Sequence, residues 1–258
     1  MDLPAPDAPT MATDSPAAMS NETSSTMVSN PSGLVTFFVR LSALSTLIRL
    51  FQLLLFLALA TSARADVAAS RTIVVLGDSL SAGYGINVQE GWVSLLSRRL
   101  ASEGYGYKVV NASVTGETTQ GGVSRLPRAL KMHKPEILIL ELGGNDGLRG
   151  LQLATSRENL QRSITLAKEA GAKVLLVGMM IPPNYGPRYT QEFRDMFGQL
   201  GVKNSIAVVP FLLDRVALNP QLMQDDGIHA NAKGQPQMLE NLWPRLKPML
   251  VAPGKPKG

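Results

Sequence analysis

The chain has 258 residues, with 25 Lys and Arg against 20 Asp and Glu, two His and no Cys. The absence of cysteine excludes disulfides, thiolate metal ligands, a cysteine nucleophile and a cysteine-linked lipid anchor, and a zinc site would need mainly carboxylate ligands. For that reason we expect no catalytic metal. The basic residues are scattered rather than interleaved with aromatics, so we do not expect nucleic-acid binding either, whereas attraction to anionic lipid or a cell-wall polymer stays open.

The beginning of the chain has the composition of a disordered segment followed by a targeting signal. Residues 1–33 are rich in Pro, Ala, Ser, Thr and Met and show no apolar periodicity. Two arginines, the apolar run Leu53–Ala60 and an Ala-x-Ala site ending at Ala65 come next. These parts are typical of a secretory signal peptide, so we expect cleavage after Ala65 and export to the periplasm or out of the cell.

Two alternatives concern this segment. An uncleaved membrane anchor is disfavoured because Arg49 and Gln52 leave an apolar run well short of the ~20 residues that span a bilayer. The stretch before the arginines is long for the basic region of a signal peptide, so an internal start at Met27 stays open. We therefore divide the chain into residues 1–65, a disordered N-terminus plus signal peptide, and residues 66–258, one folded domain.

From residue 71 onward, short β-branched runs alternate with longer helix-like segments. The predicted strands are 72–76, 107–111, 137–142, 173–179 and 206–210. The predicted helices are 89–103, 119–133, 155–170, 189–200 and 232–250. Runs that are apolar throughout suit strands buried on both faces, and repeated alternation of strand and helix implies parallel strands with right-handed crossovers. We expect a three-layer α/β/α sandwich around a five-stranded parallel sheet.

Polar residues follow several of the predicted strands. The loops after the first three strands contain Ser79, Gly116 and Asn145, and the loop before the last helix contains Asp226 and His229. In open α/β sheets, ligands bind outside the carboxyl ends of the strands. The order of elements therefore predicts that these five residues meet at one edge of the sheet.

Ser79 lies in LGDSLSAGYG, residues 76–85, and is either a nucleophile or the polar turn that ends a strand. The stretch lacks the lysine and hydroxyl of a phosphate-binding loop and a full G-x-G-x-x-G, which disfavours a nucleotide site. It also lacks the G-x-S-x-G of a nucleophile elbow. Ser79 would therefore be a nucleophile of a different local geometry, and the stretch by itself leaves the turn open.

A serine nucleophile needs a base that is itself oriented by a carboxylate. His133 ends a helix-like segment, where a cation suits the helix C-terminus, so we interpret it as a solvated cap. His229 lies in a polar loop three residues after Asp226. At that spacing the carboxylate can hold Nδ1–H and leave Nε2 facing a distant serine, although a structural loop histidine stays open.

Acyl transfer also requires hydrogen-bond donors for the tetrahedral oxyanion. The candidates are the backbone N–H groups of Ser79 and Gly116 and the side-chain amide of Asn145, and glycine permits the close approach. Each has a plain structural alternative, a turn for the glycine and a loop cap for Asn145. Because four separate loops each supply a different required part, the combination favours a serine hydrolase.

These segments resemble the SGNH/GDSL hydrolase superfamily. Gly77-Asp-Ser-Leu80, Gly116, Gly143-x-Asn145-Asp and Asp226-x-x-His229 stand in the order of its four sequence blocks. Over residues 71–250 the chain is similar to the bacterial thioesterase I, lysophospholipase and arylesterase branch. The longer matching segments are GDSLSAGY at 77–84, ELGGNDGLRG at 141–150, PNYG at 183–186 and MQDDGIH at 223–229. Ala230 departs from the branch, which usually has proline after the histidine.

The resemblance implies a flavodoxin-like fold and an exported enzyme without a cofactor. It implies hydrolysis of ester and thioester bonds, in acyl thioesters, aryl esters and lysophospholipids, through an acyl-enzyme. It further implies that Ser79 is the nucleophile, that His229 is the general base and then the acid, and that Asp226 orients His229. The oxyanion hole would consist of the Ser79 N–H, the Gly116 N–H and the Asn145 amide.

The sequence says less about the substrate. The loops after the third and fourth strands contain Leu148, Arg149, Pro183 and Tyr185, which we assign to an acyl groove beside the site. Packing and turn roles stay equally open for the prolines and methionines of these loops, and for Arg149 a solvated side chain is favoured over contact with a phosphate or carboxylate head group. The expected partner is a small-molecule acyl ester or thioester, while peripheral contact with a membrane stays open and the oligomeric state is not predicted. An SGNH deacetylase acting on a carbohydrate or cell-wall polymer is the alternative activity, and an inactive export-associated binding module is the alternative to an enzyme.

Overall fold

The five β-branched runs form one sheet. A computed structural model describes residues 71–252, so the predictions of disorder and signal-peptide cleavage in residues 1–65 lie outside the described residues. The strands are β1 (Arg71–Gly77), β2 (Tyr107–Asn111), β3 (Ile137–Glu141), β4 (Lys173–Val177) and β5 (Ala207–Val209). Every neighbouring pair is parallel, and the order is β2-β1-β3-β4-β5. This is the flavodoxin-like order, so the predicted parallel sheet is confirmed.

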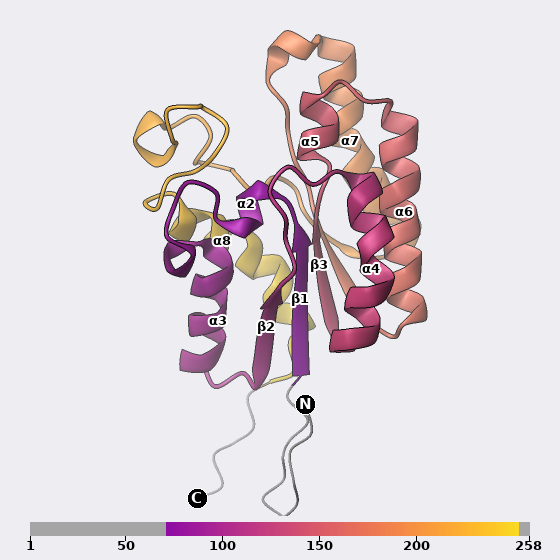
Figure 1. The fold of residues 1–258 in the computed structure, drawn as a ribbon, viewed down its shortest axis with the longest axis vertical. Coiled ribbons are helices and arrows are strands. Elements are labelled where there is room, and N and C mark those ends of the chain that lie inside the picture. Colours follow the sequence, from indigo (N-terminus) through magenta and orange to yellow (C-terminus); the bar gives the residue numbers. More distant parts are fainter. Residues whose placement is uncertain (1–70, 253–258) are drawn as a thin grey trace, which may run out of the picture. The chain divides into compact units, whose positions relative to one another are not determined.

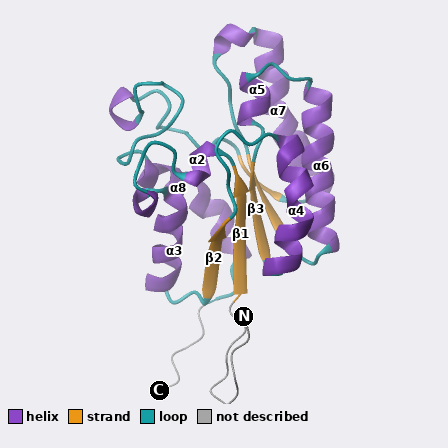
Figure 2. Ribbon diagram, viewed as in Figure 1, coloured by secondary structure: helices purple, strands orange, loops and turns teal. Residues whose placement is uncertain are grey.

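Helices cover both faces of the sheet (Figures 1 and 2). The helices α3 (Trp92–Ser102) and α8 (Gln235–Leu246) lie on one face, and α4 (Thr119–His133), α6 (Leu153–Glu169) and α7 (Pro187–Asn204) lie on the other. Two very short helices, α2 (Ser79–Ala82) and α5 (Gly144–Leu148), begin directly after β1 and β3. Short 3₁₀ turns are η1 (Val88–Glu90), η2 (Pro183–Tyr185), η3 (Pro220–Leu222) and η4 (Lys247–Met249). The layers are those of an α/β/α sandwich.

Strand β1 shows why the apolar runs carry no alternation. Ile73 and Val75 belong to the core beneath α3 and α8, whereas Val74 and Leu76 belong to the core beneath the other three helices. All four side chains are fully buried. Since successive side chains of a strand point to opposite faces, a strand covered on both sides must be apolar at every position.

Most element boundaries agree with the predicted ranges, and the exceptions have local causes. Helix α4 matches its predicted range even though Pro127 lies inside it. Helix α8 ends at Leu246 rather than near residue 250, and the chain continues as a 3₁₀ turn that contains Pro248. No helix within residues 71–252 is both long enough and apolar enough to cross a bilayer.

The strand order determines where the site forms. Strand β1 lies between β2 and β3, so the chain leaves β1 toward one side and returns to the sheet on the other. This reversal opens a crevice outside the carboxyl ends of β1 and β3, the usual position of ligands in such sheets. The short helices α2 and α5 begin at that crevice and carry Ser79 and Asn145 into it.

Candidate active site

Ser79 is the first residue of α2, and its position is fixed by the residues on either side. The Asp78 side chain caps the helix by accepting a hydrogen bond from the Leu80 N–H at 3.0 Å. Gly83, with φ of 80°, ends the helix after one turn. A short polar residue at the cap and glycine in the left-handed region are the usual start and stop of a helix. The serine therefore lies in a tight, capped turn, with 9% of its surface exposed.

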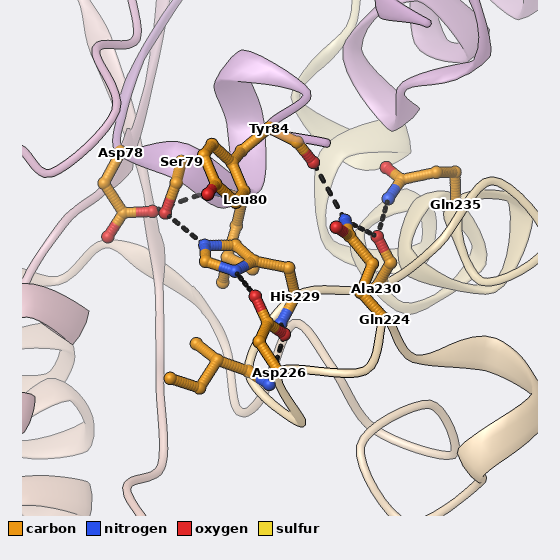
Figure 3. A network of polar contacts seen from close by, with 10 residues as sticks. Asp78, Ser79, Leu80, Tyr84, Gln224, Asp226, His229, Ala230 and Gln235 are labelled. Carbon is orange, nitrogen blue, oxygen red and sulfur yellow. Dashed lines mark hydrogen bonds and ion pairs between the residues drawn. The ribbon is translucent and has the colours of Figure 1, made fainter. Parts of the chain in front are cut away.

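The hydroxyl of Ser79 is joined to a histidine and an aspartate (Figure 3). His229 Nε2 lies 2.8 Å from Ser79 Oγ, and His229 Nδ1 lies 2.6 Å from Asp226 Oδ2. The other Asp226 oxygen accepts hydrogen bonds from the Ile228 and His229 N–H groups, each at 2.9 Å. Gly227, with φ of 65°, lets the backbone make this tight turn. The fold thus brings the three side chains predicted as a triad into one hydrogen-bonded chain.

The charge of Asp226 is set by its local donors. Partial burial acts to raise the pKa of its carboxyl, but hydrogen bonds from the His229 N–H, the His229 ring and the Ile228 N–H together lower that pKa to about 2. The carboxyl is therefore ionised at neutral pH. An anion fixed against Nδ1 holds the imidazole with Nε2 directed at the serine hydroxyl.

Tyr84 and Gln224 complete this region, and neither was singled out from the sequence. The Tyr84 ring lies against the His229 ring, with centroids 4.6 Å apart, and is 49% exposed. The Gln224 amide donates to the Tyr84 carbonyl at 2.9 Å and to the Ala230 carbonyl at 3.0 Å. It therefore ties the loop after α2 to the histidine loop (Figure 3). The only sequence signal for both was their inclusion in the two matching segments.

The three predicted oxyanion donors lie around the same crevice. Within residues 71–252 the Ser79 and Gly116 N–H groups have no hydrogen-bond acceptor, and Gly116 has a φ of 77°. Asn145 Nδ2 donates to the Glu117 carbonyl at 3.0 Å and to Asp78 Oδ2 at 3.2 Å. Both hydrogens of this amide therefore have acceptors in the structure.

Asp146, the residue after Asn145, is held in place by hydrogen bonds from two other helices. Its carboxyl is 2% exposed and accepts hydrogen bonds from the Thr119 N–H at 2.9 Å, the Thr119 hydroxyl at 2.5 Å and the Ser156 hydroxyl at 3.0 Å. These contacts join α5 to the starts of α4 and α6. Asp146 thereby fixes the orientation of the short helix that carries Asn145.

The four residues assigned to an acyl groove have mixed environments. Arg149 is exposed, and its guanidinium donates to the Gly116 carbonyl at 3.0 Å. The Tyr185 hydroxyl donates to the Leu148 carbonyl at 2.6 Å, and Pro183 is exposed on η2. Arg149 thus contacts the oxyanion loop, Leu148 and Tyr185 contact each other, and no contact joins Pro183 to the triad within the described residues. His133, interpreted as a cap, is the last residue of α4.

Comparison with known proteins gives the context of this geometry. Residues 75–236 match the model of the GDSL-like Lipase/Acylhydrolase family. The chain is 50% identical over 183 residues to the Esterase TesA of Pseudomonas aeruginosa, which covers 71% of this chain and 91% of that protein. It is 41% identical over 183 residues to the Thioesterase 1/protease 1/lysophospholipase L1 of Escherichia coli K12, with coverage of 71% and 86%.

A solved structure agrees with these sequence relatives. The psychrotrophic esterase EstA from Pseudoalteromonas sp., in a structure inhibited by monoethylphosphonate, matches with a TM-score of 0.67 and 37% identity. That match covers 69% of this chain and 97% of EstA.

Proposed function

The chain belongs to the GDSL-like Lipase/Acylhydrolase family, and we propose that it hydrolyses carboxylic esters and thioesters through a Ser79, His229 and Asp226 triad. The family membership confirms the resemblance inferred from the sequence, and the named relatives make ester hydrolysis the activity class of this chain. The observation that supports the triad is the continuous hydrogen-bonded chain from Ser79 Oγ to the Asp226 carboxylate.

In the acylation step, Ser79 Oγ attacks the substrate carbonyl carbon as its proton moves to His229 Nε2. The ionised Asp226 accepts the Nδ1–H hydrogen bond and stabilises the imidazolium that forms. The imidazolium then protonates the leaving group, at oxygen for an ester or at sulfur for a thioester. The acyl group stays bound to Ser79 as an ester. Water deprotonated by His229 attacks that ester, and the acid product leaves as the proton returns to Ser79.

The oxyanion of each tetrahedral intermediate needs donors beside Ser79. The backbone N–H groups of Ser79 and Gly116 are suited to this role because nothing in the described chain accepts from them. The Asn145 amide supplies a third donor when the N–H held by Asp78 turns partly toward the substrate oxygen. The Arg149 hydrogen bond to the Gly116 carbonyl helps to keep that loop in place.

The substrate class follows from the surroundings of the triad and from the relatives' names. The exposed Tyr84 ring beside His229 offers a flat apolar wall for an acyl chain or an aryl leaving group. We assign acyl thioesters, aryl esters and lysophospholipids as candidate substrates. Leu148, Arg149, Pro183 and Tyr185 remain the proposed acyl groove, and the Arg149 cation suits an anionic head group.

We also retain the proposal that residues 1–65 are removed on export and that residues 66–258 act as one domain outside the cytoplasm. The basic flank, apolar run and Ala-x-Ala site support it. Mass analysis of the protein recovered from the periplasm of an expression host tests the cleavage. A mature chain that begins at Asp66 is expected, whereas a full-length chain retained in the membrane contradicts the proposal.

The central experiment measures hydrolysis of p-nitrophenyl butyrate by the wild type and by the Ser79→Ala variant. Loss of the nucleophile should lower kcat by on the order of 10⁶, as in other serine triads. A fluorophosphonate probe should label the wild type and leave the variant unlabelled. Near-normal turnover by Ser79→Ala ends the proposal, and acetate release with no preference for longer acyl chains would instead favour the carbohydrate deacetylase.

A further inference from the structure

Two carboxyl side chains outside the triad lie behind the nucleophile. Glu141 ends β3 and is paired in the sheet with Gly77, the last residue of β1. Its side chain is fully buried, and that of Asp78 is only 2% exposed. Neither residue takes part in the acyl transfer described above. Buried acids that lack a structural or catalytic partner are rare, because burial disfavours their charged form.

The contacts of Glu141 fix the turn that carries Ser79. One oxygen of Glu141, Oε2, accepts a hydrogen bond from the Asp78 N–H at 3.2 Å and another from the Ser81 hydroxyl. A Cβ atom on Gly77 would overlap that same oxygen, so only glycine leaves room for it. Glu141 therefore holds the residue before the nucleophile and the residue two positions after it.

Asp78 extends these contacts to the oxyanion donors. One of its oxygens caps α2 through the Leu80 N–H, and the other accepts from Asn145 Nδ2. Glu141, Asp78 and Asn145 thus form one continuous polar network that passes directly behind Ser79.

The two acids cannot both be ionised. No Lys or Arg forms an ion pair with either of them in the part of the chain that the structure describes, and Glu141 Oε1 has no donor from which to accept. Burial, together with the nearby Asp78 charge, raises the pKa of Glu141 well above its ordinary value. Burial also raises the pKa of Asp78, to about 6, but the Leu80 N–H and the nearby His229 favour its anion. At neutral pH the proton therefore resides on Glu141.

We propose that Glu141 is a positioning residue that works as a neutral acid: it accepts from the Asp78 N–H and the Ser81 hydroxyl and leaves a single negative charge, that of Asp78, beside Ser79. This inference rests on the proposed function of Ser79. A second charge would oppose the oxyanion that forms in front of the serine.

The test compares three variants, Glu141→Gln, Glu141→Leu and Glu136→Gln. Glutamine keeps an acceptor for the Asp78 N–H and the Ser81 hydroxyl but cannot titrate, whereas leucine removes that acceptor at similar volume. Glu136 directly precedes the same strand, pairs with Arg71 and Lys173, and serves as the matched control. Turnover is expressed per active site titrated with a fluorophosphonate, from pH 4 to pH 9.

We expect Glu141→Leu to lower kcat by ~10–10² with a small change in KM, because the Asp78 N–H and the Ser81 hydroxyl lose the acceptor that fixes the turn carrying Ser79. Glu141→Gln should stay within about threefold of the wild type, since an amide reproduces the neutral acid's hydrogen bonds. Its acid limb of kcat/KM should keep its position, because no charge is removed. Glu136→Gln should change neither quantity.

Three outcomes overturn the proposal. Wild-type kcat per titrated site in Glu141→Leu shows that Glu141 only fills space. A shift of the acid limb of Glu141→Gln to lower pH shows that Glu141 is ionised, because removal of a negative charge weakens proton binding by the base. The absence of a protonated-carboxyl infrared band in the wild type at neutral pH, relative to Glu141→Gln, also overturns it. The infrared result is independent of turnover, so it tests the protonation of Glu141 even if the leucine variant does not fold. Failed labelling of wild-type Ser79 by the fluorophosphonate would separately refute the proposed function.

Discussion

Replacing Glu141 with glutamine should change how the stability of the protein depends on pH. A carboxyl whose pKa is raised on folding is protonated in both states below its unfolded pKa of about 4.3. Above that pH the unfolded chain releases the proton while the folded chain keeps it, so the free energy of unfolding falls as pH rises. Burial raises the pKa of Glu141 in this way, and glutamine cannot titrate. The wild type should therefore lose stability with rising pH relative to Glu141→Gln.

The magnitude follows from proton linkage. The slope for one group is at most about 1.4 kcal/mol per pH unit, so from pH 5 to pH 7 the stability difference should change by up to ~3 kcal/mol. For a domain of this size such a change is a shift of about 6–12 °C in the Tm difference. Asp226, whose pKa is about 2, loses its contribution only in stronger acid.

The assay is urea or thermal unfolding of both proteins at pH 5, 6 and 7, with Glu136→Gln as the control. Taking differences at each pH removes the contributions of groups that titrate alike in both proteins. Wild type and Glu141→Gln curves that run parallel would show that Glu141 releases its proton at an ordinary pH, which refutes the argument for a neutral buried acid. The control should run parallel to the wild type, since its side chain is partly exposed and paired with cations.

Four further substitutions test the site and the backbone packing at the end of β4. Asn145→Ala should lower kcat by ~10²–10³ with little change in KM, and an effect confined to KM would contradict its role as an oxyanion donor. Asp226→Asn should melt near the wild type but lose ~10³–10⁴ in kcat at neutral pH, because the amide no longer holds the required imidazole tautomer; normal turnover would exclude it from the triad. Tyr84→Ala should raise KM for aryl esters by about tenfold, measured against p-nitrophenyl esters of several lengths, whereas an unchanged KM would remove it from the substrate wall. Gly178→Ala should lower the free energy of unfolding by ~1–3 kcal/mol in urea titrations at unchanged turnover per titrated site, because its Cβ would lie 2.5 Å from the Pro210 carbonyl and 2.8 Å from that of Val209; wild-type stability would show that this backbone yields.

The fold was predictable because its elements are long or strongly patterned. Strands such as β3 and β4 are mostly apolar runs, and helices such as α4 carry buried side chains at helical spacing. The short helices α2 and α5 were not predicted, since four or five residues are too few to show a helical period and GNDGL also contains two glycines. They exist because a cap, a left-handed glycine or a buried aspartate holds a single turn in place. Such tertiary support has no periodic signature in the sequence.

The reacting groups were easier to predict than the residues that position them. Ser79, Asp226 and His229 stand in recognisable blocks, and the fold brings their side chains within hydrogen-bond distance. Tyr84 and Gln224 act through contacts between loops that are 140 residues apart in the sequence, so no local pattern reveals them. The hydrogen bonds already made by Asn145 were equally hidden, because they depend on how two loops pack.

Glu141 did leave one signal in the sequence. It is an acid inside a run that is otherwise apolar, at the carboxyl end of a central strand, where the alternative of a solvent-exposed face does not exist. The glycine before the nucleophile turn has the complementary explanation, because any side chain on Gly77 would occupy the space of the Glu141 carboxyl. Gly77, Asp78 and Glu141 therefore act together to fix the turn that carries Ser79. Since Gly77 and Glu141 are paired in the sheet, a change at either should displace Ser79 and lower turnover through that displacement.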